Sequence, residues 1–247
     1  MNTIIRTRET RNWWNIITLG TLAVIVFSMI WLSACSSGSA DSAKTNKAAT
    51  PPPASSAVTA KESVPLSLSN AGEYGENVYD YAKANDWRNA DAKLVALRDA
   101  VKKVRTDVKN KAVDRLDTNV AALDRAVTAK HRQATMREAN QVTLDVANMT
   151  MAYKLSVPVE VTRLDYFGRE LEVWAQVKDE KELQAAAREM RREWNALRPS
   201  IETHSAAEAK KFDALVARVE AARTPADYDR VATPVLNEVD NLEKLFP

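Results

Sequence analysis

The feature that most limits how this chain can fold is an internal repeat of amphipathic helices with a period of 93 residues. Laying residues 63–65 over residues 156–158, which both read Ser-Val-Pro, places Gly75 on Gly168. The apolar positions that then coincide are Ala90, Leu94, Leu97, Val101, Val104 and Val108 with Leu183, Ala187, Met190, Trp194, Leu197 and Ile201. Both sets step by four and three residues in turn, which is the stripe of one buried helical face.

The correspondence continues to the end of the chain. With a shift of one residue, the next matched set is Leu116, Val120, Leu123 and Val127 with Glu208, Phe212, Leu215 and Val219. With the original period, the last set is Ala139, Val142, Val146, Met149 and Tyr153 with Ala232, Val235, Val239, Leu242 and Phe246. We therefore expect an all-α helical bundle built from two tandem copies of a roughly 93-residue helical-hairpin unit, at 62–154 and 155–247.

Residues that cap helices support this division. Asp86 and Asp179 stand just before the long stripes, where a carboxylate accepts hydrogen bonds from free backbone N–H groups. Further helix starts are predicted at Ser205 and at Thr224, the latter followed by Pro at the first helical position. Each copy should contain a short first helix (about 74–84 and 167–177), a long helix, a third and a fourth. The expected interior includes Trp174, Trp194 and Phe212, and Pro234 is expected to kink the last helix.

The amino terminus carries a different signal. A basic stretch with Arg6, Arg8 and Arg11 precedes an uncharged apolar run from Ile16 to Trp31, which is the arrangement of a signal peptide. The run closes on Leu32-Ser33-Ala34-Cys35, and Cys35 is the only cysteine. This resembles the lipobox of bacterial lipoprotein precursors. The alternative is that residues 13–34 form an uncleaved transmembrane anchor, since about 20 apolar residues suffice to cross a bilayer.

The resemblance implies that residues 1–34 are removed and that Cys35 receives acyl chains, which hold the protein on a membrane facing the periplasm. Several chains are needed because one chain binds only marginally. By the same resemblance, Ser36 implies transfer to the outer membrane in a Gram-negative host. Residues 35–61 are rich in Ser, Ala, Thr and Pro, a composition that predicts a disordered tether. A flexible chain of that length spans on the order of 28 Å.

Charge and composition exclude several functions. The whole chain has a formal charge of +2, and residues 1–34 carry three Arg and one Glu, so the mature protein is formally neutral. No basic footprint for nucleic acid or for anionic lipid is visible in this total. The chain has five Gly and no nucleotide-binding glycine loop. We expect no catalytic residues, no metal and no cofactor.

The residues that could contradict this expectation have structural explanations. His131 and His204 lie near predicted turns at places that are not equivalent in the two copies. Met149 occupies a core position whose copy is Leu242, which favours packing over ligation. The acidic residues Glu238, Asp240 and Glu243 lie off the apolar stripe of the last helix, which predicts a solvated face.

Two aromatic residues are not explained by the repeat. Tyr79 and Trp87 in the first copy meet Glu172 and Glu180 in the second, so the shared fold does not require them. They are candidates for a partner surface, with a structural role for Trp87 at the junction of the first two helices as the alternative. The leading hypothesis is a non-enzymatic, lipid-anchored envelope protein that binds or scaffolds another envelope protein. The competing hypothesis is a carrier of a small ligand or metal inside the bundle. The partner and the oligomeric state stay open.

Overall fold

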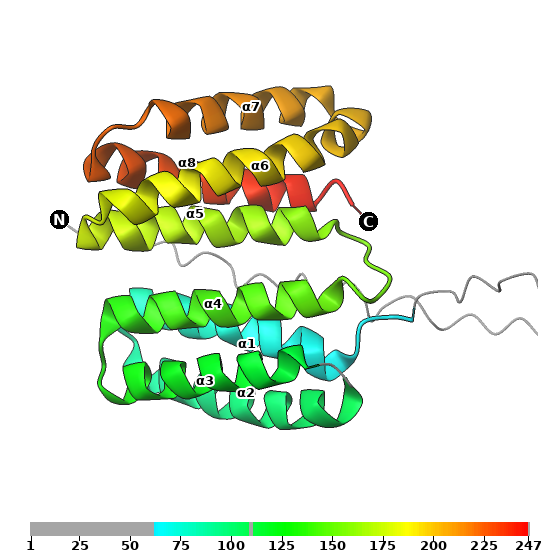
Figure 1. Ribbon diagram of the computed structural model, residues 1–247, viewed down its shortest axis with the longest axis vertical. Coiled ribbons are helices and arrows are strands. Elements are labelled where there is room, and N and C mark those ends of the chain that lie inside the picture. The colour runs from blue at the N-terminus through cyan, green and yellow to red at the C-terminus, as the bar shows by residue number, and fades with distance from the viewer. Residues whose placement is uncertain (1–61, 109–110, 247) are drawn as a thin grey trace, which may run out of the picture. The chain divides into compact units, whose positions relative to one another are not determined.

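The computed structural model describes residues 62–108 and 111–246, and the described residues form eight α-helices (Figure 1). The helices are α1 (Leu66–Lys83), α2 (Trp87–Asp107), α3 (Ala112–Thr128), α4 (Arg132–Thr150), α5 (Val159–Val177), α6 (Glu180–His204), α7 (Ala206–Ala221) and α8 (Pro225–Glu243). The expectation of an all-α fold is confirmed for this part of the chain. None of these helices is long and apolar enough to cross a membrane. The signal peptide (1–34), Cys35 and the tether (35–61) lie outside the described residues.

The helices form two groups of four. In the first group α1 contacts α2 and α4, and α3 contacts α2 and α4; in the second, α5 contacts α6 and α8, and α7 contacts α6 and α8. Each group has its own apolar core, one centred on residues such as Leu94 and Leu116 and the other on Trp194 and Phe212. The two groups meet mainly through α4 and α5 (Figure 1).

The predicted apolar stripes of the long helices are buried. The five positions in α2, Val108 directly after it and all six positions in α6 are at most 6% exposed. Trp194 and Phe212 are fully buried with ring centroids 4.6 Å apart, whereas Trp174 is only partly buried against the second core. Burying a large side chain of this kind stabilises the fold by about 1.5–3 kcal/mol, so these stripes hold each group together.

The helix caps also follow the sequence. The side chains of Asp86, Asp179 and Ser205 each accept a hydrogen bond from the backbone N–H three residues later. Thr224 and Asp227 form a reciprocal capping box with Pro225 at the first helical position. The α8 helix contains Pro234 in its interior.

The predicted starts of the first helix in each group, at about residues 74 and 167, are wrong. The α1 helix begins at Leu66 and α5 at Val159, directly after Pro65 and Pro158. Both prolines have nearly the same backbone angles, with φ of −58° and −56° and ψ of 137°. In these first turns polar residues take buried positions, with Ser67 6%, Ser69 3% and Thr162 7% exposed, while Leu66 is 60% exposed. The Ser67 hydroxyl donates to Asp107 at 2.6 Å. The apolar periodicity is therefore weak there.

The predicted register of the third helix in the second group is also wrong. Leu215, expected on the buried stripe, is only partly buried, while Ala209 and Val216 are at most 1% exposed. The buried positions of α7 therefore follow those of α3 with an offset of 96 residues instead of 92. The α6 helix runs four residues longer than α2, and this extra turn displaces the start of the core stripe in α7.

Two glycines allow close packing of the first and last helix in each group. A Cβ at Gly75 would lie 3.2 Å from Val142 Cγ1 and from Thr143 Oγ1. A Cβ at Gly168 would lie 2.6 Å from Leu236 Cδ2 and 3.4 Å from Val235 Cγ1. Every residue of the second contact is 93 positions after its counterpart in the first, so the two groups share the same helix-to-helix contact.

Candidate functional site

The most unusual chemistry of the described residues lies between the two groups, where polar and charged side chains of α1 and α4 meet α5. We call this region the polar seam. Its main members are Tyr79, Asp80, Lys83, Asn140, Asp165, Arg169, Glu170 and Glu172. A buried charge costs folding free energy unless it is paired and hydrogen-bonded. Each charged side chain of the seam should therefore have a partner close by.

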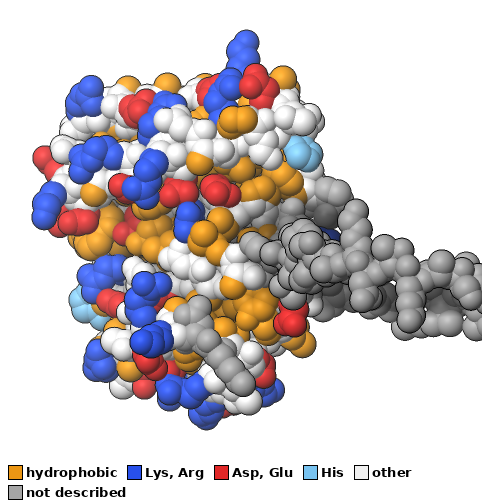
Figure 2. Space-filling view, turned by 45° about the vertical axis from the view of Figure 1, so that its right-hand side comes forward, with side chains coloured by type: hydrophobic (Ala, Val, Ile, Leu, Met, Phe, Trp, Pro, Cys, Tyr) orange, Lys and Arg blue, Asp and Glu red, His pale blue; other side chains and the backbone are white. Residues whose placement is uncertain are grey.

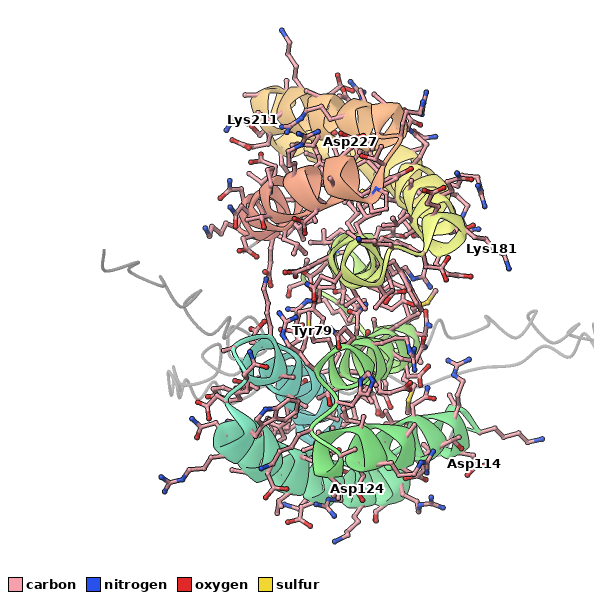
Figure 3. All side chains as sticks on the ribbon, turned by 90° about the vertical axis from the view of Figure 1, so that its left-hand side faces the viewer. Tyr79, Asp114, Asp124, Lys181, Lys211 and Asp227 are labelled. Carbon is pink, nitrogen blue, oxygen red and sulfur yellow. The ribbon has the colours of Figure 1, made fainter. Side chains whose placement is uncertain are left out.

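Tyr79 connects α1 to α5. Its side chain is labelled in Figure 3. The hydroxyl donates to Glu172 Oε2 at 2.9 Å and lies 3.5 Å from the Arg169 carbonyl oxygen. Lys83 Nζ lies 2.5 Å from the other oxygen of Glu172. Burial, followed by the charge of Glu172, raises the pKa of Tyr79 well above its ordinary value. The phenol is therefore neutral and serves as a hydrogen-bond donor to the carboxylate.

Arg169 is the central cation of the seam. Its side chain is 2% exposed, its Nε donates to Asp165 Oδ2 at 2.7 Å, and its Nη1 lies 3.6 Å from Asp80 Oδ1. The guanidinium also stacks over the Tyr79 ring at 4.6 Å from the centroid. Burial lowers the pKa of Arg169, but the nearby carboxylates of Asp165 and Asp80 outweigh burial and raise it. Arg169 therefore stays charged, pairs with Asp165 within α5 and joins α5 to α1 through its ion pair with Asp80.

A second set of polar contacts links α4 to α5. Asn140 Nδ2 donates to Glu170 Oε1 at 2.7 Å and to the Tyr166 carbonyl at 3.1 Å. Trp174 Nε1 donates to the other oxygen of Glu170 at 2.6 Å. Burial raises the pKa of Glu170, and the two hydrogen bonds oppose this shift. Arg137 lies over the Trp174 ring at 5.9 Å.

A narrow cleft opens at one side of the seam. It is lined by Glu76, Val157, Val161, Thr162, Asp165, Val239 and Glu243. Its volume is about 10 Å³, which is close to the minimum that holds one water molecule. Among the described residues no group of three or more His, Cys, Asp or Glu side chains is arranged to hold a metal ion.

The structure places the two candidate partner residues differently. Tyr79 is 1% exposed, so it is not part of an outer surface, and the residue it contacts is Glu172, its own equivalent in the second group. The repeat does not require an aromatic here because this position faces the other group. Trp87 is partly buried at the first turn of α2 and packs against the first core. This is the structural role at the junction of the first two helices that the sequence offered as the alternative to a partner surface.

The other residues examined in the sequence have ordinary structural roles. His131 caps α4, with Nδ1 accepting from the Ala134 N–H. His204 is exposed and its ring lies 4.7 Å from that of Phe246. Met149 is buried in the first core, whereas Met151 is 46% exposed. Glu243 lines the cleft and is 9% exposed, so the expectation that it lies on a solvated face is wrong.

Sequence reasoning missed Arg169, Asp165 and Glu170. A signal was present, because the positions where the two copies differ in charge lie on one helical face. Glu76 aligns with Arg169, Tyr79 with Glu172 and Lys83 with Gln176, a spacing of three and four residues. Comparison of the chain with protein-family models, with curated proteins and with solved structures finds no match.

Proposed function

We propose that this chain is a lipid-anchored lipoprotein of the bacterial envelope, held on the membrane through Cys35, whose helical part binds another envelope protein without catalysing a reaction. The lipobox Leu32-Ser33-Ala34-Cys35 supports the anchor. We further propose that α1–α4 and α5–α8 are two copies of one unit. The equivalent prolines, caps and glycine contacts of the two groups support the duplication.

The observation that supports a binding function is that side chains fill the interior of both groups. The inward-facing side chains of both groups are aliphatic or aromatic and largely inaccessible to solvent, and the cleft beside the seam has room for about one water molecule. A carrier of a small molecule usually encloses a pocket of about 300–1,000 Å³. The geometry therefore favours recognition on the outer surface over a ligand held inside the bundle.

The anchor is tested by intact mass and membrane fractionation of the native protein beside Cys35→Ala. The proposal expects cleavage before Cys35, added acyl mass and membrane association for the native protein, with loss of the acyl mass in the variant. If both proteins retain residues 1–34 and stay in the membrane, the segment is a transmembrane anchor and the lipoprotein proposal fails.

Partner binding is tested by site-specific photo-crosslinking in cells. The chain offers a matched pair of exposed positions, Arg88 beside Trp87 and its equivalent Lys181 beside Glu180. A photoreactive residue at position 88 should give a discrete adduct with one envelope protein, whereas position 181 should not. The same faint background at both positions would contradict a partner site near Trp87.

A further inference from the structure

We propose that the outer face of the α2–α3 hairpin docks on the anionic phospholipid surface of the membrane to which the chain is tethered. This inference rests on the proposed lipid anchor. The formal neutrality of residues 35–247 hides a strong internal asymmetry. Residues 87–132 contain twelve Lys and Arg against six Asp, a net charge of +6, while residues 155–247 contain fourteen against eighteen, a net charge of −4.

The equivalent hairpin of the second group does not share this charge. Residues 180–225 contain nine Lys and Arg against eight Asp and Glu, a net charge of +1. The repeat therefore provides an internal control, since a helical hairpin of this kind does not need the excess of cations. Five exposed cations make no ion pair within the described part of the chain, and they are Arg88, Lys103, Lys111, Arg125 and Lys130.

Within the described residues, two of the four ion pairs made by cations of the α2–α3 hairpin have a carboxylate much less exposed than the cation, whereas Arg98–Asp124 and Lys102–Asp99 have both partners exposed. Arg105 pairs with Asp117 and Arg115 with Asp145, and the cations are 60% and 56% exposed while the carboxylates are 32% and 1% exposed. The acidic partners thus lie beneath the cations. In the second group the order is mixed, since Arg191 is 30% exposed beside a Glu220 that is 46% exposed, while Lys211 is 57% exposed beside a Glu208 that is 20% exposed.

The excess of cations over carboxylates belongs to the α2–α3 hairpin by sequence. Figure 2 shows Lys and Arg side chains over both the upper and the lower part of the visible face, and α2 and α3 lie in the lower part (Figure 1). These two helices form the layer of the first group farthest from α5 (Figure 1), since α5 packs against α4 and its side chains reach α1. The face is therefore not used by the other half of the chain.

The short length of chain between Cys35 and the described helices favours a membrane surface as the partner of the α2–α3 face. Residues 36–61 are all that separates Cys35 from the described helices, and 26 residues reach at most about 90 Å, so an anchored domain meets the bilayer at high effective concentration. Each Lys or Arg near an anionic surface strengthens association by about fivefold. A face with several such cations then turns toward anionic lipid, and the screening length of about 10 Å at 0.1 M salt makes this contact sensitive to salt.

The test uses the acylated protein in vesicles of neutral phosphatidylcholine, with or without about one third of anionic phosphatidylglycerol, a fraction chosen to give a clear negative surface potential. Cys35 is the only native cysteine and is acylated in this protein, so a dye can be placed at the exposed Ala121→Cys on α3 or at the exposed Ala214→Cys on α7. Energy transfer to a headgroup-labelled lipid reports how close each face lies to the bilayer.

The proposal expects higher energy transfer at position 121 in anionic than in neutral vesicles, and no such rise at position 214. Reversing two exposed charges with Lys102→Glu and Lys103→Glu should lower the docked-to-undocked ratio at least about tenfold. The matched pair Lys210→Glu and Lys211→Glu changes the net charge equally on α7 and should leave the ratio within about twofold, because surface substitutions seldom disturb the fold.

Two negative results have different meanings. A protein without acyl mass that fails to join either kind of vesicle would overturn the anchor. An acylated, vesicle-bound protein whose energy transfer at position 121 is equal in both lipids, or equally affected by both pairs of charge reversals, would overturn only the docking proposal and leave the basic face to an acidic protein or polymer.

Discussion

The Tyr79 hydroxyl of α1 donates a hydrogen bond of 2.9 Å to the Glu172 carboxylate of α5, and the two residues are 93 positions apart. They occupy the same place in the two copies of the unit that we propose was duplicated, and the contact joins the first helix of one four-helix group to the first helix of the other. An aromatic residue in one copy and a carboxylate in the other form a donor and acceptor pair that two identical residues could not form as well. The difference between the copies is therefore the basis of the contact.

The hydroxyl of Tyr79 should contribute measurably to stability. Tyr79→Phe removes one buried hydrogen bond to a charged acceptor, and the free energy of unfolding should fall by about 1.5–3 kcal/mol. Tyr74→Phe is the control, because the Tyr74 ring is stacked by Lys93 at 5.1 Å and would be retained. Urea denaturation of both variants measures the difference, and equal losses would show that the Tyr79 contact adds nothing specific.

Arg169 should be the most sensitive residue of the polar seam. Arg169→Met removes the guanidinium from beside the buried Asp165, and removing one member of a buried ion pair costs about 3–5 kcal/mol. The exposed Arg125, which makes no ion pair within the described residues, provides the control Arg125→Met, expected to stay within about 0.5 kcal/mol. Should chemical denaturation give similar midpoints for the two variants, the seam would not depend on this charge.

The two glycines should respond unequally to alanine. Gly168→Ala places a Cβ 2.6 Å from Leu236 Cδ2 and 3.1 Å from its Cγ, so the side chain has to move, and such overpacking costs about 1–3 kcal/mol. Gly75→Ala meets its neighbours only at 3.2 Å, and the gain in helix propensity of about 1 kcal/mol offsets the strain. Thermal denaturation should rank Gly75→Ala as the more stable variant.

A double-mutant cycle identifies the cause of the loss in Gly168→Ala. If the clash with Leu236 is responsible, Leu236→Ala should cost less in the Gly168→Ala background than in the native protein. Strictly additive changes in unfolding free energy would contradict the steric explanation and point to the backbone instead.

The α8 capping box should make stability depend on acid pH. Hydrogen bonds from the Thr224 side chain and from the backbone N–H groups of Arg223 and Thr224 lower the pKa of Asp227 from 3.8 to about 2. A carboxyl group with a depressed pKa in the folded state stabilises it above pH 3.8, and this contribution disappears as the pH falls through about 2.

Asp227→Ala should therefore lower the melting temperature at neutral pH, and the gap from the native protein should close between about pH 4 and pH 2. Asp229→Ala, two residues later on α8, provides the control with the same change in charge. Melting curves at several pH values measure the gap, and a gap that is constant with pH would show that the carboxylate charge is not responsible.

Sequence alone determined the local features of this protein. The long helices, their buried faces and the caps Asp86, Asp179, Ser205 and Thr224 were predictable because each depends on residues within a few positions of one another. The sequence alignment also placed Gly75 on Gly168, and the structure shows both glycines at close contacts between the first and last helix of their groups. The starts of α1 and α5 were missed because their first turns carry polar residues, and the register of α7 was missed because an extra turn of α6 moved it.

Only the tertiary structure decided which helical faces meet. Tyr79 was predictable as an exception to the repeat but not as a buried partner of Glu172, because helical periodicity does not identify the helix that a given face will contact. The same holds for Arg169 and its carboxylates, and for the exposed cations of α2 and α3, whose charge is cancelled in the total for the chain. Pairings between distant helices depend on how the groups pack together, and that information is not contained in any single local pattern.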